Sequence, residues 1–533
     1  MYLISRYWSK ITIEIQIMPT ILKMDLEVII MMNGKEYLES LRDGRVVYLN
    51  GEKIDDVTTH PAYRNAARSI AQLYDAMHDP EKKDILTTKS DVGDFRTHKF
   101  FKASRSAQEL LEARDAMAEW TRFSYGFMGR TPDYKAAFLG SLGPYADFYE
   151  GFEDNARRWY KKAQEEVPFC NHTIVNPQLD RHKPLHENKD VFVRAVEERD
   201  DGVIVSGAKM VGTSAALTHY NFVANYSPQD LGDGDQSHAL IFMVPMNAPG
   251  VKVISRQSYE EMAAKLGSPY DYPLSSRFDE NDAIIVLDQV LIPWEDVFAY
   301  KNVEIVNGFR PQTGWINRYL FQGVTRFSVK LDFMAGLLLK ATEVAGTNNF
   351  RGVQARIGEV ISYRNMFWAI STAMAMDPED ALGGYKLPNS TYATAYRTFA
   401  PTVWPIIKNT FNEVVAGGLI SLPSSSKDFL NPELRPYIDQ YYKGTGTSAE
   451  DRVKLLKLVW DAIGTEFGGR NELYEINYAG NNDGIRLDAL KMANSSGQAD
   501  QYKAFVEKAM SDYDLEGWTN DIWVNPEQFE KTF

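Results

Sequence analysis

Arg130, Tyr134 and His172 carry side chains that together could hold a phenol by its oxygen and ionise it. Arg130 and Tyr134 share the run GFMGRTPDY at residues 126–134, and His172 follows directly after Asn171. A cation and hydrogen-bond donors around a phenol oxygen stabilise its anionic form. A histidine can assist removal of the proton, and a phenolate is a far stronger nucleophile than a phenol. If the fold brings them together, the three residues could bind and ionise a phenol, which makes the pattern worth pursuing.

The length of the chain predicts several packed regions, which must bring these residues together. Its 533 residues are 44% hydrophobic, and such a length predicts two or three regions rather than one core. Between residues 61 and 125 apolar residues recur at spacings of three and four, which predicts helices. They include Ala66, Ile70, Leu73, Tyr74 and Met77, and then Leu110, Ala113, Met117 and Trp120.

The pattern becomes that of strands between residues 191 and 297. Residues 192–196 and 203–205 flank a turn at Asp200-Asp201-Gly202, which predicts a hairpin. The middle of the chain is therefore predicted to be a β domain. Further strands are expected at residues 239–245, 250–254 and 283–291.

Helical spacing returns after Pro311. A long helix with a broad apolar face is expected around residues 324–339, and a second helix at residues 353–376. These faces expose more apolar surface than one helix pair can cover, so we expect a homo-oligomer and specifically a homotetramer. The predicted organisation is an N-terminal extension (1–31), an N-terminal helical domain (32–168), a middle β domain (169–305) and a C-terminal helical domain (306–533).

Charge and cysteine content argue against several classes of protein. The formal net charge is −14 without a basic block, so nucleic acid is not an expected partner. Cys170 is the single cysteine, which excludes an intramolecular disulfide and favours a reducing cytoplasm. Lys23, Asp25 and Glu27 interrupt the apolar stretch in residues 1–31 before it could span a membrane. Neither membrane insertion nor a signal peptide is expected.

The chain contains neither a GxGxxG nor a Walker A motif, so it encodes no standard dinucleotide- or nucleotide-binding loop. Five of its segments together resemble one enzyme family. The chain is similar to the oxygenase component of 4-hydroxyphenylacetate 3-monooxygenase. This is a two-component aromatic hydroxylase family that includes pyoverdine- and paerucumarin-type tailoring hydroxylases. The resemblance covers nearly the whole chain from Met32. The segments are GFMGRTPDY at 126–134, NPQLDR at 176–181, SGAKMVGTSA at 206–215, SSRFDEND at 275–282 and GTEFGGR at 464–470.

The resemblance implies a fold and a reaction. The fold is α+β and acyl-CoA dehydrogenase-like, with an N-terminal helical domain, a middle β domain and a C-terminal helical bundle. A separate NAD(P)H:flavin reductase would supply reduced FAD, and O2 would be the co-substrate. One oxygen atom would enter the ring ortho to a phenolate, converting 4-hydroxyphenylacetate to 3,4-dihydroxyphenylacetate. The chemistry of oxygen transfer belongs to the flavin; the preference for FAD over FMN stays open.

The resemblance also implies the site residues. Arg130, Tyr134 and His172 match the catalytic and substrate-binding residues of the family. Gln178 and Arg181 could bind the edge and charge of the flavin, Thr213 would face the ring near N5, and the segment between Tyr226 and His238 would be a mobile lid. The implied cofactor-binding residues are His172, Thr173, Ile174, Gln178, Leu179, Asp180, Arg181, Thr213, Thr465, Glu466, Phe467 and Gly468.

Each motif taken alone has a structural explanation. Arg130 could pair with Asp133 in a turn, and Thr213 could be an ordinary hydroxyl at the end of a strand. His182 and His186 have helical spacing, but Pro184 lies between them, so no metal site is predicted. The combination of motifs favours function.

Other functions remain as alternatives. The same reaction on another phenol, such as a secondary-metabolite precursor or a halogenated phenol, would show the same motifs. A non-catalytic flavin-binding oligomer would keep the fold and lose the polar trio, which is intact here. A 4-hydroxybutyryl-CoA dehydratase shares the fold but holds an iron–sulfur cluster through several cysteines, which the single Cys170 cannot provide.

Overall fold

The computed structural model describes residues 31–179, 185–188, 190–226, 236–478, 480–520 and 522–523. Several sequence predictions fall outside these residues. They concern residues 1–30, Asp180, Arg181, the side chains of His182 and His186, and most of the segment between Tyr226 and His238.

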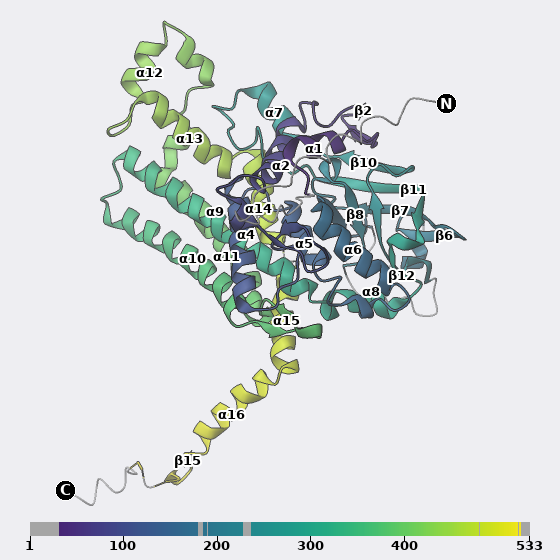
Figure 1. The fold of residues 1–533 in the computed structure, drawn as a ribbon. Helices are drawn as coiled ribbons and strands as arrows, with labels where there is room; N and C mark the ends of the chain where they lie inside the picture. The colour runs from purple at the N-terminus through teal and green to yellow at the C-terminus, as the bar shows by residue number, and fades with distance from the viewer. Residues whose placement is uncertain are drawn as a thin grey trace, which may run out of the picture.

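Two sheets form the middle of the molecule (Figure 1). The larger has the strand order β2-β1-β10-β11-β7-β6, and the smaller has the order β12-β9-β8-β5. The larger sheet contains β1 (Val47–Leu49), β2 (Glu52–Ile54), β6 (Arg194–Arg199), β7 (Gly202–Met210), β10 (Val251–Ser255) and β11 (Ala283–Pro293). The smaller contains β5 (Cys170–Thr173), β8 (Tyr220–Val223), β9 (Leu240–Pro245) and β12 (Val297–Tyr300). The predicted β6–β7 hairpin is confirmed.

One strand pairing joins regions that the sequence patterns separate. β1 lies parallel to β10, with Val47 opposite Val253, although some 200 residues lie between them. The mainly helical N-terminal region therefore completes the sheet of the middle region. Because one buried apolar cluster also runs through all three regions, the predicted domain limits remain predictions.

The N-terminal region packs helices against these sheets (Figure 1). Asn33 and Glu36 form a capping box at the start of α1, and Ser106 caps α4. Pro132 begins α5, where its missing N–H is not needed, and every residue of α5 is buried. The helices are α1 (Gly34–Ser40), α2 (Arg64–Ala76), α3 (Lys83–Leu86), α4 (Ala107–Arg122), α5 (Pro132–Leu139) and α6 (Glu153–Glu166), with a small hairpin of β3 (Thr87–Lys89) and β4 (Arg96–His98).

The C-terminal region is a bundle in which α9, α10 and α11 lie side by side (Figure 1). Gly314 and Gly346 bound α9 with φ of +67° and +70°, a conformation that favours glycine. The two predicted long helices are confirmed as α9 and α10. The helices are α7 (Tyr259–Leu266), α8 (Val303–Gln312), α9 (Trp315–Ala345), α10 (Arg351–Met376), α11 (Ser390–Val415), α12 (Arg435–Tyr441), α13 (Ala449–Ile463), α14 (Glu466–Asn477), α15 (Asn482–Ser495) and α16 (Gln498–Met510), of which α7 lies between β10 and β11.

Short two-residue strands complete this half: β13 (Glu379–Asp380) pairs with β14 (Lys386–Leu387), and β15 (Tyr513–Asp514) pairs with β16 (Gly517–Trp518). Within the described ranges, the structure contains no helix with both the length and the apolar character needed to cross a bilayer.

A buried ion cluster joins α9 to α14. Arg326 donates to both carboxylate oxygens of Glu475, at 2.6 and 2.7 Å, and Lys330 donates to one of them at 2.9 Å. All three side chains are at most 1% exposed. Burial opposes ionisation of Glu475, but the two cations outweigh it and lower its pKa to about 2. The carboxylate therefore stays charged and fixes α14 against α9.

Glu475→Gln is expected to destabilise the fold, because it leaves Arg326 and Lys330 buried without their anion. We expect a loss of about 3 to 5 kcal/mol in the free energy of unfolding, measured by urea unfolding followed by circular dichroism. Since the pKa of folded Glu475 lies below the usual 4.5, its contribution is present above pH 4.5 and is lost as the pH falls through about 2.

Glu472→Gln is the matched control for this experiment. Glu472 lies on the same helix but pairs with Lys408 in a partly exposed position, so its loss should cost at most about 1 kcal/mol. Equal losses of unfolding free energy in the two variants would show that the buried cluster stabilises the fold no more than the partly exposed ion pair.

Candidate active site

The structure brings Arg130, Tyr134 and His172 together. Arg130 lies just before α5, Tyr134 lies in the first turn of α5, and His172 lies on β5. The guanidinium carbon of Arg130 is 4.0 Å from the centroid of the Tyr134 ring, and the Tyr134 and His172 ring centroids are 5.6 Å apart. Residues that are 42 positions apart in the sequence thus form one cluster, because α5 packs against β5.

Tyrosine rings surround the Arg130 guanidinium. Besides Tyr134, the rings of Tyr474 and Tyr478 on and just after α14 lie with their centroids 5.2 Å from it. Burial alone would lower the pKa of Arg130, but the three tyrosines and Glu280 raise it above its usual value, so the group stays charged. Its Nη1 is buried and has no hydrogen-bond partner among the described residues. A buried, unsatisfied cationic donor is suited to an anionic ligand.

Gly129 is required by this arrangement. A Cβ at this position would lie 2.3 Å from the Tyr474 hydroxyl oxygen, closer than any contact that could be tolerated. The Tyr474 hydroxyl itself is buried without a partner among the described residues. The GFMGR run is thus shaped by α14, which lies more than 300 residues away in the sequence.

His172 is a neutral imidazole next to a lysine. Its Nδ1 lies 2.7 Å from Lys135 Nζ, and its ring meets the edge of Trp315 at 6.1 Å between centroids. Burial, and then the charges of Lys135, Arg130 and Arg310, lower the pKa of His172 well below its usual value. Two guanidinium cations, Arg130 and Arg310, and the titratable amine of Lys135 therefore act on the same ring.

An ion-pair chain connects Arg130 with Thr213. The Arg130 backbone N–H donates to Glu280 at 2.5 Å. Arg470 on α14 donates to Glu280 at 3.1 Å and to both oxygens of Asp282 at 2.9 and 3.0 Å. Asp282 in turn accepts the Thr213 hydroxyl at 2.6 Å. This series of ion pairs and hydrogen bonds thereby fixes the loop that carries Arg130 relative to the end of β7.

The Thr213 hydroxyl has a defined role in this chain. Partial burial opposes ionisation of Asp282, but Arg470 and Arg256 hold the pKa of its carboxyl well below the usual range. Asp282 is therefore an acceptor, so Thr213 must be the donor. The lone pairs of the Thr213 oxygen remain available to accept a hydrogen bond from a ligand.

The surface beside Thr213 fits a flavin ring. Val175 bridges to Met210, which places the NPQL run beside the end of β7. Leu179 and Val211 are 41% and 48% exposed there, and the buried Ser214 hydroxyl has no partner among the described residues. An apolar face with a few polar groups at its edge suits a flat aromatic ring with a polar rim. Gln178, on the same run, is exposed and able to contribute an amide.

The other residues implied for the cofactor have structural contacts in this chain. Thr173 and Ile174 are buried next to His172, and the Thr173 hydroxyl accepts from Asn221 at 2.8 Å. Their role in cofactor binding stays a prediction.

The GTEFGG segment forms the start of α14. The Thr465 hydroxyl caps the helix by accepting from Gly468 N–H at 3.2 Å, and Phe467 stacks on Phe127. Gly468 is packed against Ile463, while Glu466 is exposed. Their role in cofactor binding stays a prediction, as does that of Asp180 and Arg181.

Several residues of the site were missed by sequence reasoning. Lys135 directly follows Tyr134, and Glu280 lies inside the recognised SSRFDEND segment. Arg470, Tyr474 and Tyr478 recur every four residues, which places them on one helical face. That spacing was a signal that could have found them. Arg310 had no signal in the sequence.

Comparisons with known proteins identify the family to which the chain is similar. Residues 33–299 match the family described as 4-hydroxyphenylacetate 3-hydroxylase N terminal, and residues 306–507 match its C-terminal counterpart. The chain is 53% identical to the oxygenase component of 4-nitrophenol 2-monooxygenase from Rhodococcus sp, over 92% of this chain and 93% of that protein. It is also 53% identical to the 4-hydroxyphenylacetate 3-monooxygenase oxygenase component of Pseudomonas aeruginosa, over 93% and 95%.

Solved structures show the same fold. The oxygenase component of a 4-hydroxyphenylacetate 3-monooxygenase, complexed with FAD and 4-hydroxyphenylacetate, matches with a TM-score of 0.84 and 30% identity, over 90% of this chain and 99% of that chain. An archaeal 4-hydroxybutyryl-CoA dehydratase matches with a TM-score of 0.78 at 21% identity, over 94% and 98%, which concerns the fold alone. The expected α+β, acyl-CoA dehydrogenase-like fold is confirmed. The chain belongs to the 4-hydroxyphenylacetate 3-hydroxylase family.

Proposed function

We propose that this chain is the oxygenase component of a two-component, flavin-dependent monooxygenase that converts 4-hydroxyphenylacetate to 3,4-dihydroxyphenylacetate. The proposal rests on the buried Nη1 of Arg130, which lies beside Tyr134 and His172 and has no hydrogen-bond partner within the described ranges. The named relatives and the solved complex with FAD and 4-hydroxyphenylacetate support the same reaction. Bound FAD, reduced by a separate reductase, supplies the oxygen chemistry with O2 as co-substrate.

The protein's own residues hold and ionise the phenol. Arg130 places a permanent cation at the phenol oxygen, and Tyr134 provides a hydroxyl donor. His172 is neutral and therefore able to exchange a proton with the phenol at one ring nitrogen. On the flavin side, Thr213 offers acceptor lone pairs, and Ser214 offers a hydroxyl with no partner among the described residues. Together these groups fit a phenolate beside a flavin edge.

Arg310 supports a substrate with a second anionic group. It lies on α8 with its guanidinium 4.2 Å from the Tyr226 ring and 5.8 Å from the Trp315 ring. The Trp315 ring also contacts the ring of His172, at 6.1 Å between centroids. The Nε of Arg310 is buried without a partner among the described residues. A carboxylate at the far end of a phenol would satisfy it, which favours 4-hydroxyphenylacetate over a phenol with a neutral substituent.

The same reaction on another phenol is the second candidate. The relative from Rhodococcus sp named for 4-nitrophenol is as similar to this chain as the relative named for 4-hydroxyphenylacetate. A non-catalytic flavin-binding oligomer is the third, and it would require the intact trio to have no use. Substrate assays separate the three.

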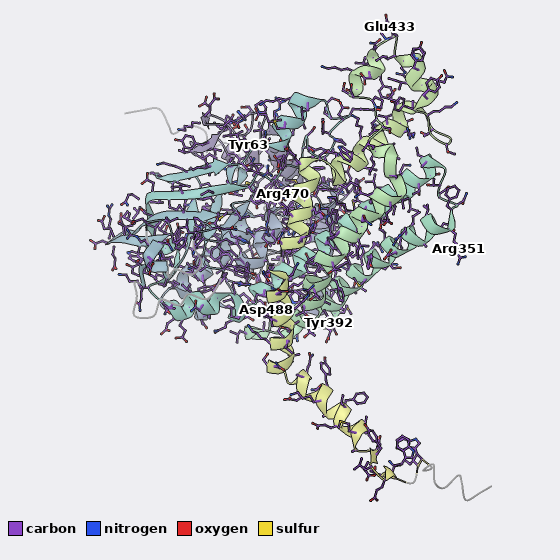
Figure 2. All side chains as sticks on the ribbon, turned by 180° about the vertical axis from the view of Figure 1, so that it is seen from behind. Tyr63, Arg351, Tyr392, Glu433, Arg470 and Asp488 are labelled. Carbon is purple, nitrogen blue, oxygen red and sulfur yellow. The ribbon has the colours of Figure 1, made fainter. Side chains whose placement is uncertain are left out.

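The assembly and location are part of the proposal. The chain is proposed to act as a homotetramer, because α16 carries exposed apolar side chains that stand away from the rest of the chain (Figure 2). They include Tyr502, Phe505, Val506 and Met510. A cytoplasmic location is proposed because the single cysteine, Cys170, is a free and buried thiol.

Arg130→Met and His172→Ala are expected to impair hydroxylation while FAD binding is retained. Arg130→Met removes the guanidinium that faces the buried phenolate, which should lower kcat/KM by at least about 30-fold, or about 2 kcal/mol. The assay mixes anaerobically reduced FAD and protein with O2 and 4-hydroxyphenylacetate and measures the ortho-dihydroxy product. Arg122→Met, an exposed arginine on α4, is the control. Simultaneous loss of FAD binding would show that the assignment of roles is wrong.

Arg310→Met is expected to change substrate preference. The KM for 4-hydroxyphenylacetate should rise at least about tenfold with little change in kcat. The reason is that the variant loses a charge-assisted hydrogen bond that stabilises the bound substrate and the transition state equally. The KM for 4-methylphenol, which lacks the carboxylate, should change less than about twofold. A similar rise for both phenols would exclude Arg310 from carboxylate recognition.

Phe505→Glu is expected to weaken the assembly without unfolding the chain, because Phe505 is 77% exposed in the isolated chain. Light scattering should report four copies of the 60.6 kDa chain for the wild type and fewer for the variant. Gln501→Glu on the same helix adds the same charge without removing apolar surface and should leave the mass unchanged. A monomeric wild type would rule out the tetramer.

A further inference from the structure

We propose that Lys135 is a positioning residue that receives the phenol proton through His172. This inference rests on the proposed function and assigns a destination to the proton that substrate ionisation must release. Neither the sequence motifs nor the predicted trio included Lys135. We call the pair the His172–Lys135 relay.

The geometry places Lys135 directly behind the histidine. Its Nζ lies 2.7 Å from His172 Nδ1 and 3.7 Å from the centroid of the Tyr134 ring. The residue is 3% exposed. Among the residues that the structure describes, no carboxylate oxygen lies within 4.0 Å of its amine. Lys135 therefore touches two members of the trio and has no counter-ion within the described part of the chain.

A buried amine without a counter-ion favours its neutral form, because an uncompensated buried charge is costly. The nearby charge of Arg130 adds to this effect. The charged or titratable groups that face the relay are Arg130, Cys170, Glu280 and Arg310. Burial raises the pKa of the Cys170 thiol, so that group is neutral.

The same causes determine the acidity of Lys135. Burial, followed by the charge of Arg130, lowers the pKa of Lys135 well below its usual value, with Cys170 and Glu280 opposing. A neutral amine offers one lone pair and accepts the Nδ1–H of His172. This tautomer leaves the lone pair of His172 on Nε2, where it can accept a proton.

Substrate ionisation then proceeds without a proton leaving the site. The phenol O–H bond breaks as the Nε2–H bond forms, and the Nδ1–H bond breaks as a third Nζ–H bond forms. The products are a phenolate, a neutral histidine that donates from Nε2, and a lysine ammonium. A lasting imidazolium is avoided, which matters because Arg130 and Arg310 already face His172. The total charge of the site does not change.

Proton counting tests the relay independently of turnover. The FAD-loaded protein is titrated with 4-hydroxyphenylacetate at neutral pH in two buffers with different heats of ionisation. A phenol of this kind has a pKa near that of tyrosine, about 10, so only about one free molecule in a thousand is ionised. For the wild type we expect the ultraviolet difference band of a phenolate with about zero protons released by calorimetry.

Two variants separate proton acceptance from charge. Lys135→Arg keeps a cation that cannot accept a proton, so the phenolate band should persist with about one proton released per site. Lys135→Met removes both properties, and the bound phenolate fraction should fall at least about tenfold. Lys162→Met is the matched control, since Lys162 also lies over aromatic rings, those of Trp159 and Tyr220, and should behave as the wild type. Retained FAD binding shows that each variant is folded.

Each other outcome overturns a defined part of the proposal. Release of one proton by the wild type, or binding of the neutral phenol, overturns the relay and leaves the proposed function intact. Zero release in Lys135→Arg with a phenolate band also overturns it. If the wild type does not bind 4-hydroxyphenylacetate, the phenol site fails and the relay fails with it. Should both variants fail to fold, the wild-type proton count decides alone.

Discussion

The bonds of Arg470 to Glu280 and Asp282 hold the candidate active site together. Glu280 fixes the backbone of Arg130, and Asp282 fixes the hydroxyl of Thr213. One guanidinium on α14 thus joins the loop before α5, the segment that leads into β11, and the end of β7. A planar fork can hold two carboxylates in fixed directions, which a flexible ammonium could not do as well. The phenol side and the flavin side of the site therefore have one common support.

The position of α14 depends in turn on the Glu475 cluster. Two cations against one carboxylate leave a net positive charge in the core next to the tyrosines around Arg130. Tyr474 and Tyr478 lie on either side of Glu475 in the sequence, so the residues that fix the helix and those that shape the site alternate along it. Packing stability and site geometry are consequently difficult to change separately in this helix.

Positive charge is the shared property of the phenol side. Arg130 is a permanent cation, and Arg310 adds a second guanidinium next to the Trp315 ring. The pKa of both Lys135 and His172 is lowered, so these two residues respond to a ligand rather than add fixed charge. An anionic substrate is favoured by this distribution, and a neutral phenol can be ionised within it. The arrangement accounts for phenolate chemistry in a chain whose overall charge is −14, because the local field at a buried site is set by its nearest groups.

The sequence by itself determined the order of helical and strand regions, because apolar periodicity is a local property, and its motifs predicted Arg130, Tyr134, His172 and Thr213 as site residues. It did not determine that β1 pairs with β10 across the chain, nor that Thr465, Phe467 and Gly468 build a helix start against the core. Only the tertiary structure decided that Lys135 contacts His172 and that Arg310 lies next to the Trp315 ring. Such contacts join residues remote in sequence, and their energies depend on burial and neighbouring charges, which no local pattern records.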